Sequence, residues 1–453
     1  MRILVTGASG LIGKNLIRNS LSLGHQVYAL VRSPDKFFML PKKNVIAWNH
    51  NEIPDLSDLD PLDAIVHLAG ESIADSYWTK DRKKSIAESR IIGTRNLVLA
   101  VKRLPPDKRP KAFISGSAIG YYGYQRKEIL DESATSGTDF LAKVCIEWEA
   151  EALAAENLKM RVVVPRTGIV ISREGGALAK MPPIQISDGQ HWMSWIHIKD
   201  MVQILQLMIE DETISGPVNC VTPNPLRNRD FVGLLAEFHK VPLIGSVPRF
   251  VLSLVLGEAA SVIVSSLSVQ PKFLNDKGFQ FQFPDLKSAL QEELKDWNRL
   301  DNSLFKDQFV PLKPDQIFPF FSKAENLETL TPPWLNFKIK AKSNEFLKKE
   351  SVIDYKLKIH GVSVYWRTLI SDWKNNEFFV DEQIKGPYSK WHHLHLFEPV
   401  PGGCLLRDEV TYQIPGSLVG KLLLGRWIEK TVNKIFSFRQ KRIEEITKLG
   451  QLQ

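Results

Sequence analysis

The chain has 453 residues, 43% of them hydrophobic and 24% charged, which is the composition of a globular protein long enough for two or three domains. Its formal net charge is +8, and residues 421–448 hold eight basic against three acidic side chains. This local excess predicts a basic helix face rather than a nucleic-acid groove, because no nucleic-acid recognition motif accompanies it. The three cysteines are far apart, which argues against a disulfide framework and against a zinc site.

The amino terminus enters a strand pattern at once and leaves no room for a signal peptide. The best membrane candidate, 250–267, contains Gly257, Glu258 and four serines, so we expect a buried or pocket-lining helix and no integral membrane segment. These features predict a cytoplasmic protein in a reducing compartment. The sequence leaves the oligomeric state open.

The first element is an apolar strand, 2–6, which breaks into glycines and is followed at once by a helical pattern. A strand, a glycine turn and a helix N-terminus in this order hold a pyrophosphate, because free backbone N–H groups and the helix dipole point at the anion. An ordinary tight turn is the alternative. We expect cofactor contacts from Gly7, Ser9, Gly10, Leu11, Ile12 and Gly13.

Strand and helix patterns alternate through the first 220 residues, which predicts an α/β fold with a doubly wound parallel sheet. The expected strands are 2–6, 26–31, 64–68, 111–116 and 161–165, and the expected helices are 11–23, 79–103 and 139–156. Residues 221–300 are expected to form a small helical substrate lobe, with helices at 231–239, 250–266 and 285–293. A polar join at 296–304 closes a first domain of residues 1–300.

The pattern after residue 304 predicts a second domain, 305–450, of the α+β class. Expected strands are 305–310, 335–341, 351–359, 362–373, 377–384, 388–397 and 404–414, with short helices near 314–329 and a long helix at 418–449. The apolar stripe of the long helix consists of Leu422, Leu423, Trp427, Ile428, Val432, Ile435 and Phe436. A long helix against a curved antiparallel sheet is expected to enclose an apolar space.

The residues after two of the strands bear on the choice of cofactor. Arg32 ends the second strand, where an acidic residue would hold a ribose 2′-hydroxyl and a basic one suits a 2′-phosphate. It therefore favours NADP over NAD, with a solvated surface arginine as the alternative. Leu68, Ala69 and Gly70 follow the third strand and are expected to pass beneath the adenosine side of the nucleotide.

Residues 1 to about 300 resemble the extended short-chain dehydrogenase/reductase superfamily, in particular its atypical "epimerase family protein" branch. The shared motifs include Thr6–Gly13, His67–Glu71, Trp78–Thr79, Ser89–Arg90, Ser115–Gly123, Pro165–Val170, Gly189–Asp200 and Gly216–Asn219. Pro248–Phe283 resembles the branch's own C-terminal extension. The resemblance implies a Rossmann-like fold that binds NADP, with Pro165 among the cofactor contacts. The loop at 181–188 is shorter than usual there, so the substrate mouth is expected to be more open.

Typical relatives use a Tyr-x-x-x-Lys pair, in which the lysine lowers the tyrosine pKa for proton transfer. No tyrosine here lies four residues before a lysine: Lys143 falls at the lysine position, but Asp139 replaces the tyrosine. Ser117 falls at the position of the family's substrate-carbonyl hydroxyl, and Tyr121 or Tyr122 is the expected proton donor, with Tyr121 preferred. The alternatives are an exposed first-turn lysine for Lys143 and a packing aromatic for each tyrosine. Asp139 is expected to cap its helix, with a carboxylate base as the alternative.

Two further segments contain candidate histidines. His191 is the reserve candidate for proton transfer. His393 and His395 share one strand face, but we expect no metal site, because no nearby cysteine or carboxylate is expected to complete a tetrahedral set. They are expected to line the cavity or to pair with Asp408 or Glu409.

The order of elements in 305–450 resembles the START-like, helix-grip superfamily, which includes polyketide cyclases and proteins that hold apolar ligands. The combined expectation is an NADP-dependent oxidoreductase or epimerase that acts on a small or amphipathic molecule and is fused to a domain for an apolar ligand. The alternative is a non-catalytic NADP-binding sensor or ligand carrier, which the missing Tyr-x-x-x-Lys pair favours. We expect small molecules as partners and no nucleic acid.

Overall fold

The computed structural model describes residues 1–73, 77–178, 181–359 and 361–450. Contacts divide the chain into two compact units. The first contains Met1–Pro34 and Asn44–Asp296, and the second contains Asp35–Lys43 and continues from Trp297. In the described part of the chain, no helix is both long and apolar enough to cross a membrane.

The first unit is built on a parallel sheet in the order β13-β8-β5-β4-β1-β2-β3, which confirms the predicted α/β class. The strands are β1 (Arg2–Thr6), β2 (Gln26–Val31), β3 (Val45–Ala47), β4 (Ala64–His67), β5 (Ala112–Ser115), β8 (Arg161–Thr167) and β13 (Gly216–Cys220), and the two-residue β6 (Ser117–Ala118) pairs with β8. β3 and β13 were not predicted. The direction of strand progression reverses beside β1, and such a switch point opens a crevice at the carboxyl ends of the strands.

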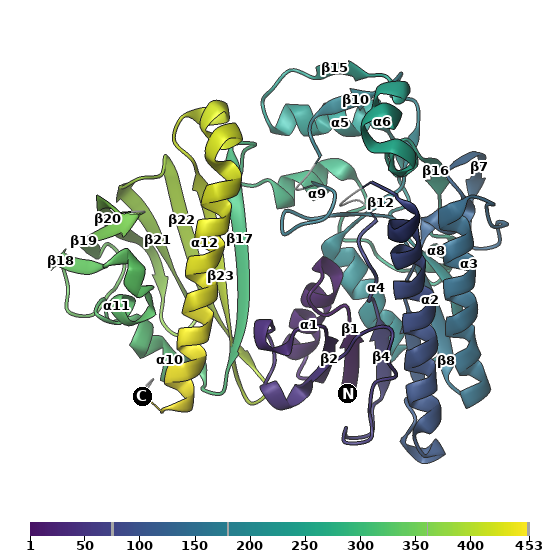
Figure 1. The fold of residues 1–453 in the computed structure, drawn as a ribbon, viewed down its shortest axis with the longest axis horizontal. Coiled ribbons are helices and arrows are strands. Elements are labelled where there is room, and N and C mark those ends of the chain that lie inside the picture. Colours follow the sequence, from purple (N-terminus) through teal and green to yellow (C-terminus); the bar gives the residue numbers. More distant parts are fainter. Residues whose placement is uncertain (74–76, 179–180, 360, 451–453) are drawn as a thin grey trace. The chain divides into compact units, whose positions relative to one another are not determined.

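Helices cover both faces of this sheet (Figure 1). α2 (Lys80–Arg103) packs beside α3 (Phe140–Leu153), and α1 (Leu11–Ser22) packs beside α4 (Ile198–Glu210). The central residues of β1, β2 and β4 are apolar, because a parallel sheet covered on both sides buries both faces of each strand. The strand ends are in register: Thr6 lies beside Leu30 and His67, and His67 lies beside Ser115. The turns that follow four strands therefore meet at one edge.

The lobe that follows the sheet is less helical than predicted. Its helices are α5 (Asn228–Phe238), α6 (Arg249–Leu256), α7 (Ala260–Ile263), α8 (Lys272–Asp276) and α9 (Leu286–Glu293). The helix expected at 250–266 is interrupted because Gly257 adopts a φ of +59°, and Ser266 instead begins a strand. Short strand pairs complete the unit: β7 (Gln125–Leu130) with β16 (Ser266–Val269), β9 (Ile169–Ile171) with β12 (Trp195–His197), β10 (Ile184–Ile186) with β15 (Ile244–Val247), and β11 (Trp192–Met193) with β14 (Leu226–Arg227).

The second unit is an antiparallel sheet in the order β17-β23-β22-β21-β20-β19-β18. Its strands are β17 (Asp301–Val310), β18 (Lys338–Lys342), β19 (Val352–Ile359), β20 (Val362–Lys374), β21 (Phe378–Lys385), β22 (Lys390–Val400) and β23 (Gly403–Gln413). The short helices α10 (Pro314–Phe321) and α11 (Asn326–Leu330) lie between β17 and β18 in the chain. The long helix α12 (Ser417–Lys448) runs along one face of the sheet (Figure 1).

The buried stripe of α12 begins later than predicted. Val432 and Phe436 are buried and pack against the sheet, whereas Leu423 is 77% exposed. Trp427 is also exposed, and the side chain of Leu422 lies outside the described part. The stripe continues toward the C-terminus through Ile443 and Ile446, which join a core rich in phenylalanine. A cavity of about 10 Å³ beside this core is lined by Gln308, His395, Asp408, Arg439 and Gln440, among others, and has room for about one water molecule.

Candidate functional site

The glycine turn after β1 is a close approach of backbone to backbone. Gly7 has a φ of +64°, and a Cβ placed on it would lie 2.5 Å from the carbonyl oxygen of Leu68. A Cβ on Gly13 would lie 2.4 Å from the carbonyl oxygen of Gly7. The turn is closed by the Gly10 N–H, which donates to Gly7 O at 2.9 Å. Only glycine fits at positions 7 and 13, so the predicted turn is a packed structure that also brings the loop after β4 against it.

The N-terminus of α1 is open to an anion. Its N-cap residue, Gly10, has no side chain to cap the helix, and no acidic residue stands in the first turn. The N–H groups of Leu11, Ile12 and Gly13 therefore have no intrahelical acceptor. Ser9 and Gly10 are exposed. These donors, together with the helix dipole, make the end of α1 suited to a phosphate group.

A chain of hydrogen bonds fixes the loop after β4 beside this turn. The Thr6 hydroxyl accepts from the N–H groups of Leu68 and Ala69, both at 3.2 Å, and contacts His67 Nδ1 at 2.7 Å. His67 Nε2 contacts the Thr94 hydroxyl at 3.0 Å. Burial, with the nearby Arg90 charge, lowers the pKa of His67 to about 3, so the ring is neutral. The Thr94 hydroxyl donates to Arg90 O at 2.6 Å, so it accepts from His67 Nε2–H, and Thr6 donates to Nδ1. Leu68 and Ala69 are half-buried and Gly70 is exposed, as loop residues at an open strand end are expected to be.

Two arginines share one carboxylate next to this loop. Arg32 Nη1 lies 2.8 Å from Glu71 Oε1, and Arg82 Nη1 lies 3.3 Å from Glu71 Oε2. The Arg32 side chain is 77% exposed. Two cations against one anion leave a positive excess at the ends of β2 and β4, where the sequence predicted a 2′-phosphate contact.

Ser117 lies at the carboxyl end of β5 in a buried charged network. Its hydroxyl donates to Glu149 Oε1 at 2.6 Å. Glu149 forms a bidentate pair with Arg166, with N–O distances of 2.9 and 2.8 Å. Burial works to lower the pKa of Arg166, but the hydrogen bonds and charge of Glu149 outweigh it and raise that pKa. The bidentate pair orients the Ser117 hydroxyl.

The two tyrosines that follow Ser117 differ in their contacts. The Tyr122 hydroxyl is buried, donates to Asn219 Oδ1 at 2.7 Å and accepts from Arg166 Nη1 at 3.0 Å. Burial raises the Tyr122 pKa. The Tyr121 ring lies under the Arg166 guanidinium, with Cζ 3.5 Å from the ring centroid. Tyr121 is half-buried, so its phenol is the more accessible of the two.

Comparison with known proteins places these features in a family. A profile of the NAD dependent epimerase/dehydratase family matches residues 3–220, and residues 247–293 match a domain of unknown function (DUF1731). The epimerase family protein SDR39U1 homolog of Arabidopsis thaliana is 34% identical over 302 residues, which cover 64% of this chain and 86% of that protein. The chain belongs to this epimerase family.

Two further relatives agree. The epimerase family protein YfhF of Bacillus subtilis is 32% identical over 305 residues, covering 65% of this chain and 99% of that protein. A crystal structure of human epimerase family protein SDR39U1 with NADPH is 29% identical, has a TM-score of 0.58, and covers 65% of this chain and 99% of its own. These findings confirm the resemblance predicted for residues 1 to about 300. The expected cofactor class agrees with the family's name and with the NADPH in the human structure.

The epimerase unit holds the other predicted site residues at or near the same sheet edge. Asp139 caps α3 by accepting from the N–H groups of Leu141 and Ala142 at 3.0 and 3.1 Å, so the expected capping is confirmed. Lys143 is exposed in the first turn of α3. Pro165 is buried in β8 beside Val218. The structure thus supplies no Tyr–Lys pair at these positions.

His191 lies between β10 and β11 as a buried polar side chain. It is 2% exposed, and among the described residues neither ring nitrogen has a hydrogen-bond partner. Burial, with the Arg249 charge, lowers its pKa to about 4. The two ring nitrogens are available to a ligand, and the role of His191 as the reserve candidate for proton transfer stays a prediction.

Sequence reasoning missed Arg82 and Glu149. Arg82 stands in the first turn of α2, three residues after the N-cap Thr79, where nothing in a single sequence separates it from a solvated arginine. Glu149 had a usable signal. It lies on the apolar face of α3 with Cys145 and Ala152, and a lone charge on such a face implies a buried partner.

In the second unit, the two histidines pair with carboxylates on both neighbouring strands. Asp408 lies 3.0 Å from His393 and 3.1 Å from His395, which confirms one of the two predicted partners. The premise that no carboxylate completes a cluster was wrong, because Asp381 lies directly opposite His393 on β21. Burial lowers the pKa of His395, with the His393 charge adding to it, whereas for His393 the carboxylates outweigh burial and raise the pKa.

Proposed function

We propose that the epimerase unit is an oxidoreductase or epimerase that binds NADP(H). The observation that carries this proposal is the uncapped N-terminus of α1, set beside strand ends that are in register. The NADPH in the human relative supports it. We assign the pyrophosphate to the turn of Gly7 to Gly13 and the adenosine ribose to the region of Arg32 and Gly70.

Preference for NADP over NAD rests on the two arginines. A 2′-phosphate accepts charge-assisted hydrogen bonds from Arg32 and competes with Glu71 for them. Arg82 holds the other oxygen of Glu71, so the carboxylate keeps a partner when Arg32 turns to phosphate.

The bound dinucleotide supplies hydride transfer, and the chain supplies orientation and proton transfer. Ser117 donates its own proton to Glu149, so its lone pairs are left to accept a hydrogen bond. That arrangement suits a substrate hydroxyl better than a carbonyl oxygen. Tyr121 is the proposed proton donor or acceptor, and the Arg166 cation against its ring holds the ring in place. Lys143 is proposed to reach the ribose hydroxyls. The substrate is proposed to be a small or amphipathic alcohol or its ketone.

The second candidate function is an NADP-binding sensor or ligand carrier. It is favoured by Asp139, which caps α3 where relatives are expected to place a catalytic tyrosine. The sensor would bind NADPH as tightly and transfer no hydride.

Deuterium transfer distinguishes the two functions. Full-length protein is incubated with NADPH deuterated at C4 and with panels of ketones and aldehydes, and products are analysed by mass spectrometry. An enzyme transfers deuterium, and Tyr121→Phe reduces the rate at least tenfold without weakening NADPH binding. Tyr124→Phe, a change at an exposed tyrosine of the same segment, is the control and retains the rate. Tight NADPH binding without transfer to any panel member supports the sensor.

We further propose that the second unit is a START-like domain for an apolar or amphipathic small molecule. The order of its seven strands and the long α12 along the sheet support this. The cavity of about 10 Å³ beside α12 is far smaller than such a ligand, so binding requires α12 to move. Hydrogen exchange of the full-length protein, before and after extraction of bound lipids, tests this. Binding is expected to change exchange in α12, and unchanged exchange argues against the proposal.

A further inference from the structure

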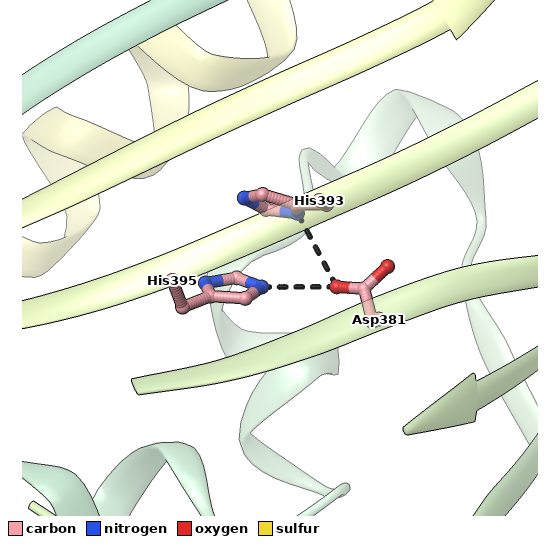
Figure 2. A group of neighbouring side chains, drawn as sticks. All are labelled: Asp381, His393 and His395. Atoms are coloured by element: carbon pink, nitrogen blue, oxygen red, sulfur yellow. Dashed lines mark hydrogen bonds and ion pairs between the residues drawn. The ribbon is translucent and has the colours of Figure 1, made fainter. Parts of the chain in front are cut away.

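Three neighbouring strands of the second unit place four ionisable side chains in one array. His393 and His395 lie on one face of β22, with Asp381 of β21 opposite His393 and Asp408 of β23 opposite His395. The imidazole rings lie against each other with centroids 3.6 Å apart and their planes tilted by 38°. Their side chains are only 5% and 4% exposed. Figure 2 shows one carboxylate oxygen of Asp381 directed at both rings.

Each imidazole contacts a carboxylate through both of its nitrogens. Asp381 Oδ2 lies 3.3 Å from His393 Nδ1 and 2.9 Å from His395 Nε2. Asp408 Oδ1 lies 3.0 Å from His393 Nε2 and 3.1 Å from His395 Nδ1. Neutral imidazoles carry one N–H each, so two neutral rings supply only two protons for these four contacts. Supplying four would require two adjacent imidazolium cations next to Arg439, whose Nη2 lies 3.1 Å from His395 Nδ1.

A metal ion removes this shortage of protons. We propose that Asp381 Oδ2, His393 Nδ1 and His395 Nε2 bind a divalent transition-metal ion such as Zn²⁺. Ligand atoms about 2.0–2.1 Å from a tetrahedral Zn²⁺ lie roughly 3.3 Å from one another. The distances from Asp381 to the two nitrogens, 3.3 and 2.9 Å, are close to that spacing. All three ligand atoms lie within 4.8 Å of one another.

The far sides of the rings form the support that metal-binding histidines require. With Nδ1 of His393 and Nε2 of His395 on the metal, the remaining N–H of each ring donates to Asp408 Oδ1. Such a carboxylate fixes the tautomer and ring orientation and strengthens the ligands. Arg439 Nη2 lies 3.4 Å from the same oxygen and holds Asp408 in its charged form.

Protons are the competing occupants of the site. In the metal-free arrangement, protons on the ring nitrogens occupy the contacts to Asp381 and Asp408, and Arg439 Nη2 lies beside His395 Nδ1. Metal binding displaces the protons on the Asp381 side and turns Arg439 fully to Asp408. Three protein ligands leave one tetrahedral position for water or a bound molecule, which is the pattern of catalytic rather than structural zinc.

The test is direct metal loading of the full-length protein, purified without a polyhistidine tag and stripped with chelator. We expect one equivalent of Co²⁺ to bind with the absorption bands of a tetrahedral site, and Zn²⁺ to displace it. X-ray absorption of the Zn²⁺-loaded protein should show two imidazole ligands. The proposal is overturned if the wild-type protein takes up less than about a tenth of an equivalent of metal. It is also overturned if X-ray absorption shows no imidazole among the ligands of the bound Zn²⁺.

Variants assign the ligands. His393→Gln with His395→Gln should weaken Co²⁺ binding by about 100-fold or more, and Asp408→Asn by about 10–100-fold. His392→Gln is the matched control, because His392 is adjacent on β22 and its side chain is 41% exposed. It should bind as wild type does. The assignment is contradicted if His392→Gln loses as much Co²⁺ affinity as the His393 and His395 double variant. X-ray absorption needs no variant and decides the matter if the double variant does not fold.

Discussion

The guanidinium of Arg32 and the carboxylate of Glu71 form an ion pair, with 2.8 Å between Nη1 and Oε1, at the ends of β2 and β4. Arg82 shares the same carboxylate at 3.3 Å. The pair is exposed on the Arg32 side, so it contributes little to stability. Its significance is electrostatic, because Arg32 and Arg82 carry two positive charges against the one negative charge of Glu71 and can accommodate a second anion.

Replacement of Arg32 should change cofactor preference. We expect Arg32→Ala to weaken NADPH binding by about 10–100-fold, since a hydrogen bond to a charged group is worth about 1.5–3 kcal/mol. NADH, which lacks the 2′-phosphate, should bind with less than about threefold change. Fluorescence titration measures both. Arg95→Ala, at an exposed ion pair on α2, is the control. Equal losses for NADPH and NADH would show that Arg32 does not contact the phosphate.

Gly7→Ala should damage both the fold and the cofactor site. The substitution forces a Cβ to 2.5 Å from Leu68 O at a φ of +64°. Gly24→Ala is matched, because Gly24 has a φ of +80° and open space around the added Cβ. The control should lose about 1–2 kcal/mol of unfolding free energy and keep NADPH affinity. Gly7→Ala should lose more and bind NADPH at least tenfold more weakly. Identical behaviour of the two variants would refute the close approach.

Glu149→Gln should be strongly destabilising. It leaves Arg166, whose side chain is 4% exposed, as a buried cation without its carboxylate partner, and replaces one carboxylate oxygen of the bidentate pair by an NH2 donor. Breaking a buried pair in this way costs about 3–5 kcal/mol. Glu151 lies on α3 like Glu149, but it pairs at the surface with Arg95 of α2. Glu151→Gln should therefore change the free energy of unfolding by less than about 1 kcal/mol. Denaturant unfolding measures both. A Glu149 variant as stable as the control would contradict the buried network.

Acid should destabilise the epimerase unit through His67. Its folded pKa is about 3, below the unfolded value of about 6.5. Between these values the unfolded state binds the proton and the folded state does not, so stability is complete above pH 6.5 and falls as pH decreases toward 3. The slope is at most about 1.4 kcal/mol per pH unit. Denaturant unfolding at pH 7.5 and 5.0 should show this loss, and His67→Gln should reduce it by about 2 kcal/mol. His392→Gln should leave the pH dependence as in wild type, and an unchanged slope in the His67 variant would count against a neutral buried ring.

The parts of the fold that depend on local pattern were predictable. The apolar runs that became β1, β2, β4 and β8 are buried on both faces and carry the pattern in full. β13 contains Gly216 and Pro217, which hide a strand from propensity reasoning. The break at Gly257 was also obscured, since an apolar sequence surrounds it and only its positive φ ends the helix.

The sequence predicted the part of the cofactor site that is formed by main-chain atoms. The turn of Gly7 to Gly13 is determined by spacing, because only glycine fits where chains approach this closely. Pairings between side chains far apart in the sequence could not be predicted. The pairing of Glu149 with Arg166, and of Asp381 with His393, depends on tertiary register that a single sequence does not state.

The most direct measurement of the central claim is a calorimetric titration of the folded full-length protein with NADPH. We predict one binding event per epimerase unit, with affinity clearly above that for NADH and much reduced in Gly7→Ala. Absence of heat and of competition with either coenzyme, oxidised or reduced, would contradict the proposed dinucleotide site.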